Sequence, residues 1–239
     1  MNTNAYKTKV TAIIGLALIL CSWTMAYAQQ EQKFALAAKQ NAQALLQYTW
    51  KSQTQIRKDG EVKATKLYSN RYAADGTVVQ LLLEENSAKL PKFGIRGIVA
   101  KKKKEEAQEL IEQLQRLAKA YAELPPAKMQ EFMKTAKATL ETNAPQPLLR
   151  LEATDVLQPG DSMIVWLDAN TRRQRRVEIN SSFDTKPLRI VTEFSDLPNN
   201  GPTYLARSVV DYPREELTLT MENFEYEHLG REEEQNLLG

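Results

Sequence analysis

Four arginines lie close together in this sequence and could bind an anion. They are Arg172, Arg173, Arg175 and Arg176, directly after a predicted turn over residues 168–171 between two strands. Guanidinium groups form paired hydrogen bonds with phosphates and carboxylates. Alternation along a strand would place Arg173 and Arg175 on one face of the sheet and the other two on the opposite face. Arg172 and Arg173 are the candidate anion contacts, and an exposed hairpin tip without a ligand is the alternative.

Residue types suited to catalysis are sparse. The single histidine, His228, lies beside Glu225 and Glu227 near an acidic C-terminus, where we expect a solvated imidazole. A zinc site of the usual composition needs more ligands. The sequence has no G-x-S-x-G elbow, no phosphate-binding glycine loop and no dinucleotide fingerprint. Its 30 acidic residues make a catalytic carboxylate pair an unspecific hypothesis. We therefore expect no enzyme, no cofactor and no metal site.

The N-terminus has the pattern of a secretory signal. Lys7 and Lys9 precede a short apolar core over residues 13–20, and Ala26 to Ala28 provide small residues before a cleavage site. We expect cleavage after Ala28 and export to the periplasm. The signal would remove two of the 32 basic residues, which leaves 30 basic residues against 30 acidic ones.

Two alternatives exist for this segment. A membrane anchor is disfavoured because the apolar run over residues 10–20 is about half of the roughly 20 residues that a spanning helix needs. No transmembrane span is expected in the mature chain. A lipid anchor at Cys21 is disfavoured because Leu20 stands where a lipoprotein signal has a small residue. Cleavage would also remove this single cysteine, so the mature chain would hold no disulfide.

A run of four lysines, residues 101–104, could contact lipid headgroups or nucleic acid. No aromatic residues interleave with it and no second basic run adjoins it, so a solvated segment is the preferred interpretation. We expect no nucleic-acid partner. Four cations disfavour a helix N-terminus, which predicts that the following helix begins near Glu105.

Hydrophobic periodicity predicts the elements of the first half of the mature chain. A helix is expected over residues 31–48. Asp59-Gly60 predicts a hairpin between strands over 50–58 and 61–72, and a third strand follows over 77–84. Residues 86–97 are expected to form a loop, with an edge strand at 95–99.

Two helices and a return to strand are expected next. Apolar residues at spacings of three and four predict helices over 105–124 and 127–142, separated by Pro125 and Pro126. The two prolines end the first helix and favour the start of the second. A strand is expected over residues 148–153.

The C-terminal stretch, residues 162–226, alternates apolar and polar residues between short turns, which predicts an antiparallel meander. About ten apolar side chains on one face would forfeit about 15 to 30 kcal/mol if left in water, which exceeds a typical net stability of about 5 to 15 kcal/mol. Helices of this chain, a partner or an apolar ligand must cover that face.

This order of elements resembles the periplasmic lipoprotein carriers of the LolA/LolB type. The local sequence is similar as well, in Ile164-Val165-Trp166-Leu167-Asp168, in Arg175-Arg176-Val177-Glu178-Ile179, and in Tyr204-Leu205-Ala206-Arg207 ahead of Asp211-Tyr212-Pro213. The resemblance implies an α+β fold, an incomplete antiparallel β-barrel with an N-terminal helix and an inserted helical pair covering its concave face. The lysine run and the two-helix insertion depart from the pattern, so the carriers' specific partner is not carried over.

The resemblance also implies a binding function, in which an apolar ligand, a lipid or a lipoprotein acyl chain is shielded from water. The expected cavity lining consists of Met163, Val165, Leu167, Val177, Ile179, Phe183, Leu188, Ile190, Phe194, Leu217, Leu219 and Met221. All are equally suited to an ordinary core. The alternative is an interaction or sensor module on the same scaffold, with its cavity filled by its own helices and another cell-envelope protein as partner. We expect one domain over residues 29–229 and a flexible acidic tail over 230–239.

Overall fold

A computed structural model describes residues 36–87, 95–142 and 146–229 of the chain. The chain divides into two compact units, residues 1–44 and 45–239. The described residues of the first unit are helical from residue 36, and this helix ends at residue 45. It lies within the helix predicted over 31–48. The predicted signal, Cys21 and the predicted tail lie outside the described residues.

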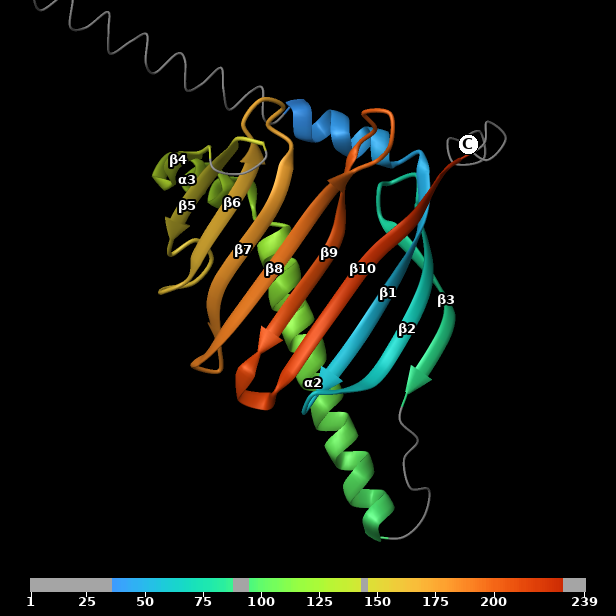
Figure 1. Cartoon of the computed structure of the whole chain (residues 1–239). Coiled ribbons are helices and arrows are strands. Elements are labelled where there is room, and N and C mark those ends of the chain that lie inside the picture. The colour runs from blue at the N-terminus through green and yellow to red at the C-terminus, as the bar shows by residue number, and fades with distance from the viewer. Residues whose placement is uncertain (1–35, 88–94, 143–145, 230–239) are drawn as a thin grey trace, which may run out of the picture. The chain divides into compact units, whose positions relative to one another are not determined.

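The second unit is built on one ten-stranded antiparallel sheet (Figure 1). The spatial order is β3-β2-β1-β10-β9-β8-β7-β6-β5-β4, so the last strand pairs with the first and the sheet stays open between β3 and β4. This open sheet with its helices confirms the predicted α+β class. The strands are β1 (Tyr48–Lys58), β2 (Glu61–Tyr72), β3 (Val78–Ser87), β4 (Lys137–Glu141), β5 (Leu148–Thr154), β6 (Ser162–Asp168), β7 (Gln174–Phe183), β8 (Lys186–Asp196), β9 (Thr203–Tyr212) and β10 (Leu217–His228).

The predicted hairpin at Asp59-Gly60 is confirmed. Asp59 and Gly60 have φ angles of 54° and 75°, which two-residue turns of this kind require and which glycine adopts without steric cost. The C-terminal meander from β6 to β10 is also confirmed, because each strand pairs with the next one in sequence.

The first inserted helix is longer than predicted. Helix α2 covers Ile95–Ala122, so both the edge strand at 95–99 and the helix start at Glu105 were wrong. The effect of the helix dipole on charges fades within the first turn. Because the helix begins at Ile95, the four lysines lie beyond that turn. One of them, Lys102, lies 3.9 Å from Glu106 at the i,i+4 spacing that stabilises helices.

The second inserted helix is shorter than predicted. Helix α3 covers Pro126–Thr135, and Ala136 then takes an extended conformation. The rest of the predicted helix forms the edge strand β4, which pairs with β5. The apolar spacing was compatible with a helix, but the free edge of β5 provides backbone partners for this segment. The 3-10 helix η1 (Pro213–Glu215) joins β9 to β10.

The two faces of the sheet differ in character. We call inner face the one that carries Ile179 and Leu188, and outer face the opposite one. The inner face is apolar from β5 to β10 and lies against α2, whose Leu114 is completely buried. The inserted helices therefore cover this part of the sheet.

Candidate ligand-binding site

The predicted lining residues gather on the inner face. Register places Met163 beside Ile179 and Ile179 beside Ile190, in one row across three strands. Nine of the twelve residues are buried, and Phe183, Phe194 and Met221 are half-buried. The sequence pattern thus identified a single apolar surface. Its role as the lining of a ligand cavity stays a prediction.

Helix α2 is attached to the sheet by a buried polar cluster near its C-terminal end. The hydroxyl of Tyr121 donates a hydrogen bond of 2.6 Å to Oδ2 of Asp161 and lies 2.8 Å from Oγ of Ser181. Asp161, only 1% exposed, also accepts hydrogen bonds from the backbone N–H groups of residues 156–158. Four hydrogen bonds thus converge on the Asp161 carboxylate, and the one from Tyr121 fixes where the helix crosses the sheet.

The pKa values of this cluster follow from its geometry. Burial alone would raise the pKa of Asp161, but the hydrogen bonds from Tyr121 and the three backbone N–H groups outweigh it and lower this pKa. Burial and the bond to Asp161 raise the pKa of Tyr121. Asp161 is therefore ionised and Tyr121 protonated at neutral pH.

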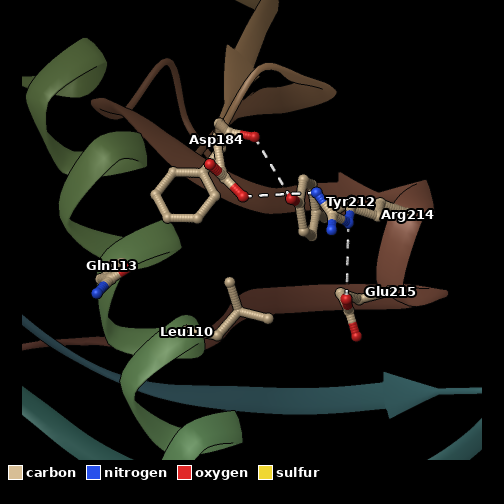
Figure 2. Close-up of a pocket in the computed structure, with 7 residues that line it drawn as sticks. Leu110, Gln113, Asp184, Tyr212, Arg214 and Glu215 are labelled. Carbon is tan, nitrogen blue, oxygen red and sulfur yellow. Dashed lines mark hydrogen bonds and ion pairs between the residues drawn. The ribbon is translucent and has the colours of Figure 1, made fainter.

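A cleft of about 540 Å³ opens between α2 and the β7–β8 end of the sheet (Figure 2). Leu110 and Gln113 of α2 form one wall, and Phe183 and Tyr212 form the other. Phe183 continues the apolar row of β7 and Tyr212 that of β9, so the cleft adjoins the inner face. Leu110 could be identified from the sequence, because it belongs to the apolar stripe that predicts α2. Tyr212 was not identified as a site residue.

Ion pairs surround the rim of this cleft. Nη1 of Arg214 lies 3.4 Å from Oδ2 of Asp184, and its Nε lies 4.0 Å from Oε1 of Glu215. These side chains are 39% to 74% exposed, so the pairs are solvent-screened and contribute little to stability. The cleft thus combines Leu110, Phe183 and Tyr212 with polar and charged side chains, a mixed lining that suits an amphipathic ligand.

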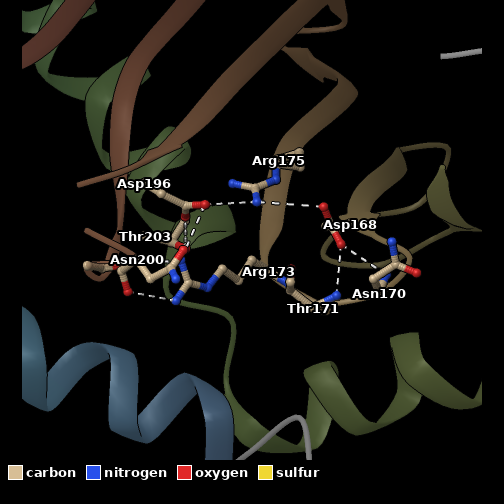
Figure 3. Close-up of polar contacts among 9 residues, drawn as sticks. Asp168, Asn170, Thr171, Arg173, Arg175, Asp196, Asn200 and Thr203 are labelled. Atoms are coloured by element: carbon tan, nitrogen blue, oxygen red, sulfur yellow. Dashed lines mark hydrogen bonds and ion pairs between the residues drawn. The ribbon is translucent and has the colours of Figure 1, made fainter. Parts of the chain in front are cut away.

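Arginines of this cluster are already paired with other residues of the same chain (Figure 3). Arg175 lies between two carboxylates, 2.9 Å from Asp196 and 3.8 Å from Asp168. Burial opposes ionisation of Asp196, but hydrogen bonds from Arg175 and Thr203 outweigh it and lower its pKa. This cluster therefore ties the β6–β7 turn to the β8–β9 loop.

The two candidate anion contacts differ in their surroundings. Arg173 donates hydrogen bonds of 3.0 and 3.1 Å to the carbonyls of Gly201 and Asn200 and lies 3.3 Å from Asp196. Arg172 is exposed at the turn with a φ of 62°. The predicted split of the cluster places Arg176 on the outer face, opposite to Arg173 and Arg175.

The outer face carries a row of charges around Trp166. Arg150 and Arg176 lie over its ring at 5.7 and 5.5 Å from the centroid, a cation–π arrangement. Its indole N–H donates a 3.2 Å hydrogen bond to Glu141. Two arginines thus cover the tryptophan on the face opposite the core. A second, polar groove of about 400 Å³ lies further along this face, lined by Gln53, Gln55, Arg57, Arg207, Val209, Thr218, Thr220 and Glu222.

The described residues show neither a metal-binding cluster nor a membrane-spanning helix. No group of three or more His, Cys, Asp or Glu side chains is arranged to hold a metal ion within residues 36–87, 95–142 and 146–229. Among the helices in these ranges, none is long and apolar enough to cross a membrane. His228 is exposed and lies 3.2 Å from the side-chain oxygen of Gln47.

Strands β1 to β3 form a different part of the sheet. All ten residues of β3 are exposed, although five of them are large and aliphatic. The one deeply buried polar side chain of β2 is Asn70, which is 2% exposed and donates to Oγ of Ser52 at 2.9 Å. Its Oδ1 accepts a 2.9 Å bond from Gln80 of β3. On the inner face these strands are therefore connected by amide hydrogen bonds and by the buried Trp50 of β1, whose ring lies 4.9 Å from that of Tyr72 of β2.

No protein-family model matches the sequence, and no curated protein matches it. Three solved structures resemble the fold. A DUF1329 family protein from Desulfovibrio piger is 10% identical, with a TM-score of 0.41 over 83% of this chain and 92% of its own. A LolA superfamily protein from Nitrosomonas europaea is 8% identical, with a TM-score of 0.40 over 84% and 96%. A putative outer membrane lipoprotein-sorting protein domain from Vibrio parahaemolyticus is 11% identical, with a TM-score of 0.37 over 84% and 96%.

Proposed function

We propose that this chain is an exported, non-enzymatic binding protein that shields a lipid, a lipoprotein acyl chain or another apolar ligand between α2 and the inner face of the sheet. The observation that carries the proposal is the cleft between Leu110 and Phe183, because Phe183 also belongs to the apolar row of the inner face. A binding site of this kind needs apolar walls and a few polar groups at its mouth. The cleft has both.

The ligand would extend along the row of buried side chains that begins at Phe183 and Leu188. The apolar cavity lining proposed from sequence belongs to this row and its neighbours. Gln113 and Arg214 would contact the polar end of an amphipathic ligand at the rim. Arg172 and Arg173 stay a separate proposal, as contacts for an anionic surface at the opposite end of β7.

The first experiment is mass spectrometry of organic extracts from the protein purified from an envelope fraction without detergent. A stoichiometric lipid or acylated species would support the proposal and name the ligand class. A clean extract together with no uptake of a fluorescent acyl probe would overturn it. The helices would then fill the site themselves, and the interaction-module alternative would replace the carrier.

A pair of tryptophan variants locates the site. Leu110→Trp adds bulk to the cleft wall, and we expect it to lower the affinity for the acyl probe by about tenfold, since an added ring displaces ligand contacts. Leu140→Trp is the matched control, because Leu140 is 59% exposed on β4 and lies outside the cleft. Equal affinities of the two variants would place the ligand elsewhere.

A further inference from the structure

Strand β3 carries apolar side chains on both of its faces and stands at the margin of the sheet (Figure 1). Val78 and Leu82 share the inner face, because they pair with Tyr72 and Tyr68 of β2. Val79 and Leu81 share the outer face. With Leu83, these five residues are 42% to 65% exposed. A strand that is apolar on both faces is typical of the interior of a sheet.

The two edges of the sheet differ in their protection. Natural edge strands are kept from pairing with other chains by short length and by charges. The opposite edge, β4, follows this rule, since it has five residues and begins and ends with the charged Lys137 and Glu141. β3 has ten residues, and its first charge is Glu84. In the described part of the chain no strand pairs with its outer edge, so its outward N–H and C=O groups offer a template for another strand.

We propose that β3 pairs antiparallel with β3 of a second copy of this chain and joins the two sheets across a two-fold axis at Gln80. A two-fold axis perpendicular to the sheet keeps both inner faces on the same side, so inner residues must oppose inner residues. Centred on Gln80, the pairing sets Val78 against Leu82 and Val79 against Leu81 of the other copy. Four of the five aliphatic side chains then meet an aliphatic side chain of the other copy, and Leu83 opposes Thr77.

This sequence is self-complementary in two further ways. A register centred on Leu81 would set Val78 against Glu84 and Gln80 against Leu82, whereas the Gln80 register leaves the glutamates outside the aliphatic segment. The Gln80 amide has two N–H donors and one oxygen acceptor, and its Nε2 donates one hydrogen bond to Oδ1 of Asn70. The second N–H of each copy can donate to the Gln80 oxygen of the other copy. Both features favour a second copy over an unrelated strand.

Sedimentation equilibrium of the purified chain tests the proposal. One strand pair buries less than the roughly 1,600 Å² of a standard complex, so we expect a monomer–dimer equilibrium with a Kd of about 10 to 100 μM. Val79→Lys and Leu81→Glu should each weaken the dimer at least about tenfold, since charges at a sheet edge oppose pairing. The matched control is Leu140→Lys on β4, which should leave the Kd unchanged.

Mixing the two variants tests the register. In the proposed pairing, Lys at position 79 of one copy faces Glu at position 81 of the other. The mixture should therefore form a heterodimer that is tighter than the self-association of either variant alone. A chain that stays monomeric up to about 500 μM, well above the expected Kd, would overturn the proposal. A dimer that is lost through Leu140→Lys, or a mixture that does not associate, would overturn it as well.

Discussion

The two ends of the sheet solve the same problem in different ways. From β5 to β10, the apolar inner face is covered by α2, and side chains such as Leu188 and Ile190 are 2% exposed. From β1 to β3, no comparable core forms in the described residues, and Leu81 is 65% exposed. Only Trp50, Ser52 and Asn70 are buried in these three strands. We call these regions the covered region and the open region. Stability and association are therefore expected to reside in separate parts of one sheet.

The largest expected effect is the difference in unfolding free energy between truncating a leucine in the covered region and truncating one in the open region. Leu188→Ala removes a buried side chain from the covered region and should lower the free energy of unfolding by about 2 to 5 kcal/mol through lost burial and the cavity left behind. Leu81→Ala in the open region should change it by less than about 0.5 kcal/mol in dilute solution, because the side chain is already in water. Urea denaturation of both variants measures the difference. Similar losses would mean that the open region is packed in solution.

An intermediate effect is expected where α2 joins the sheet. Asp161→Asn removes a charged acceptor of four hydrogen bonds and should cost about 1.5 to 3 kcal/mol at pH 7. The control is Asp184→Asn, since Asp184 is exposed and its 3.4 Å ion pair with Arg214 is screened by solvent. We expect this control to lose less than about 0.5 kcal/mol.

The effect of Asp161 should depend on pH in a defined direction. The pKa of Asp161 in the folded protein is lowered, whereas its unfolded value is about 3.9. Its contribution is therefore complete above about pH 4 and is lost as the pH falls through the folded pKa. Denaturation curves from neutral pH down to about pH 3 should show the wild type losing more stability than Asp161→Asn. A difference that stays constant over this range would show that the charge is not what stabilises the helix attachment.

The smallest effect is expected for a charged pair on the outer face. From β7 to β10 the strand register places alternating charges beside one another, in the order Arg176, Glu193, Arg207 and Glu222. The Arg207–Glu222 pair measures 3.2 Å, and both side chains are about half exposed. Arg207→Gln should therefore cost about 0.2 to 1 kcal/mol, and less at high salt. Thermal denaturation at two salt concentrations checks this, and a loss that does not respond to salt would contradict a screened ion pair.

Short-range patterns predicted most of the strands. The period-two alternation of Val177 and Ile179 and the turn at Asp59-Gly60 act within a few residues, so the sequence alone was sufficient. The helical insertion was predicted less well. Residues 137–141 had a helical spacing, but they form β4 because the free edge of β5 lies beside them. A pairing partner that is distant in sequence has no local signal.

The candidate site was predicted in part for the same reason. The apolar residues of the inner face are visible in the alternation of the strands, and Leu110 is visible in the stripe of its helix. Their meeting at the cleft depends on where α2 crosses the sheet, and the bond between Tyr121 and Asp161, 40 residues apart, sets that crossing. The sequence likewise showed the apolar residues of β3 but not that this strand lies at the margin.

The amino-acid sequence by itself determined the α+β class, the meander, the tight turns and the apolar face that needs a cover. These follow from local backbone preferences and from the period of the side chains. Only the tertiary structure decided which part of that face α2 covers, which part stays open, and that Trp166 lies between two arginines. Each of these depends on contacts between residues far apart in the chain, and their geometry exists only after the strands have paired.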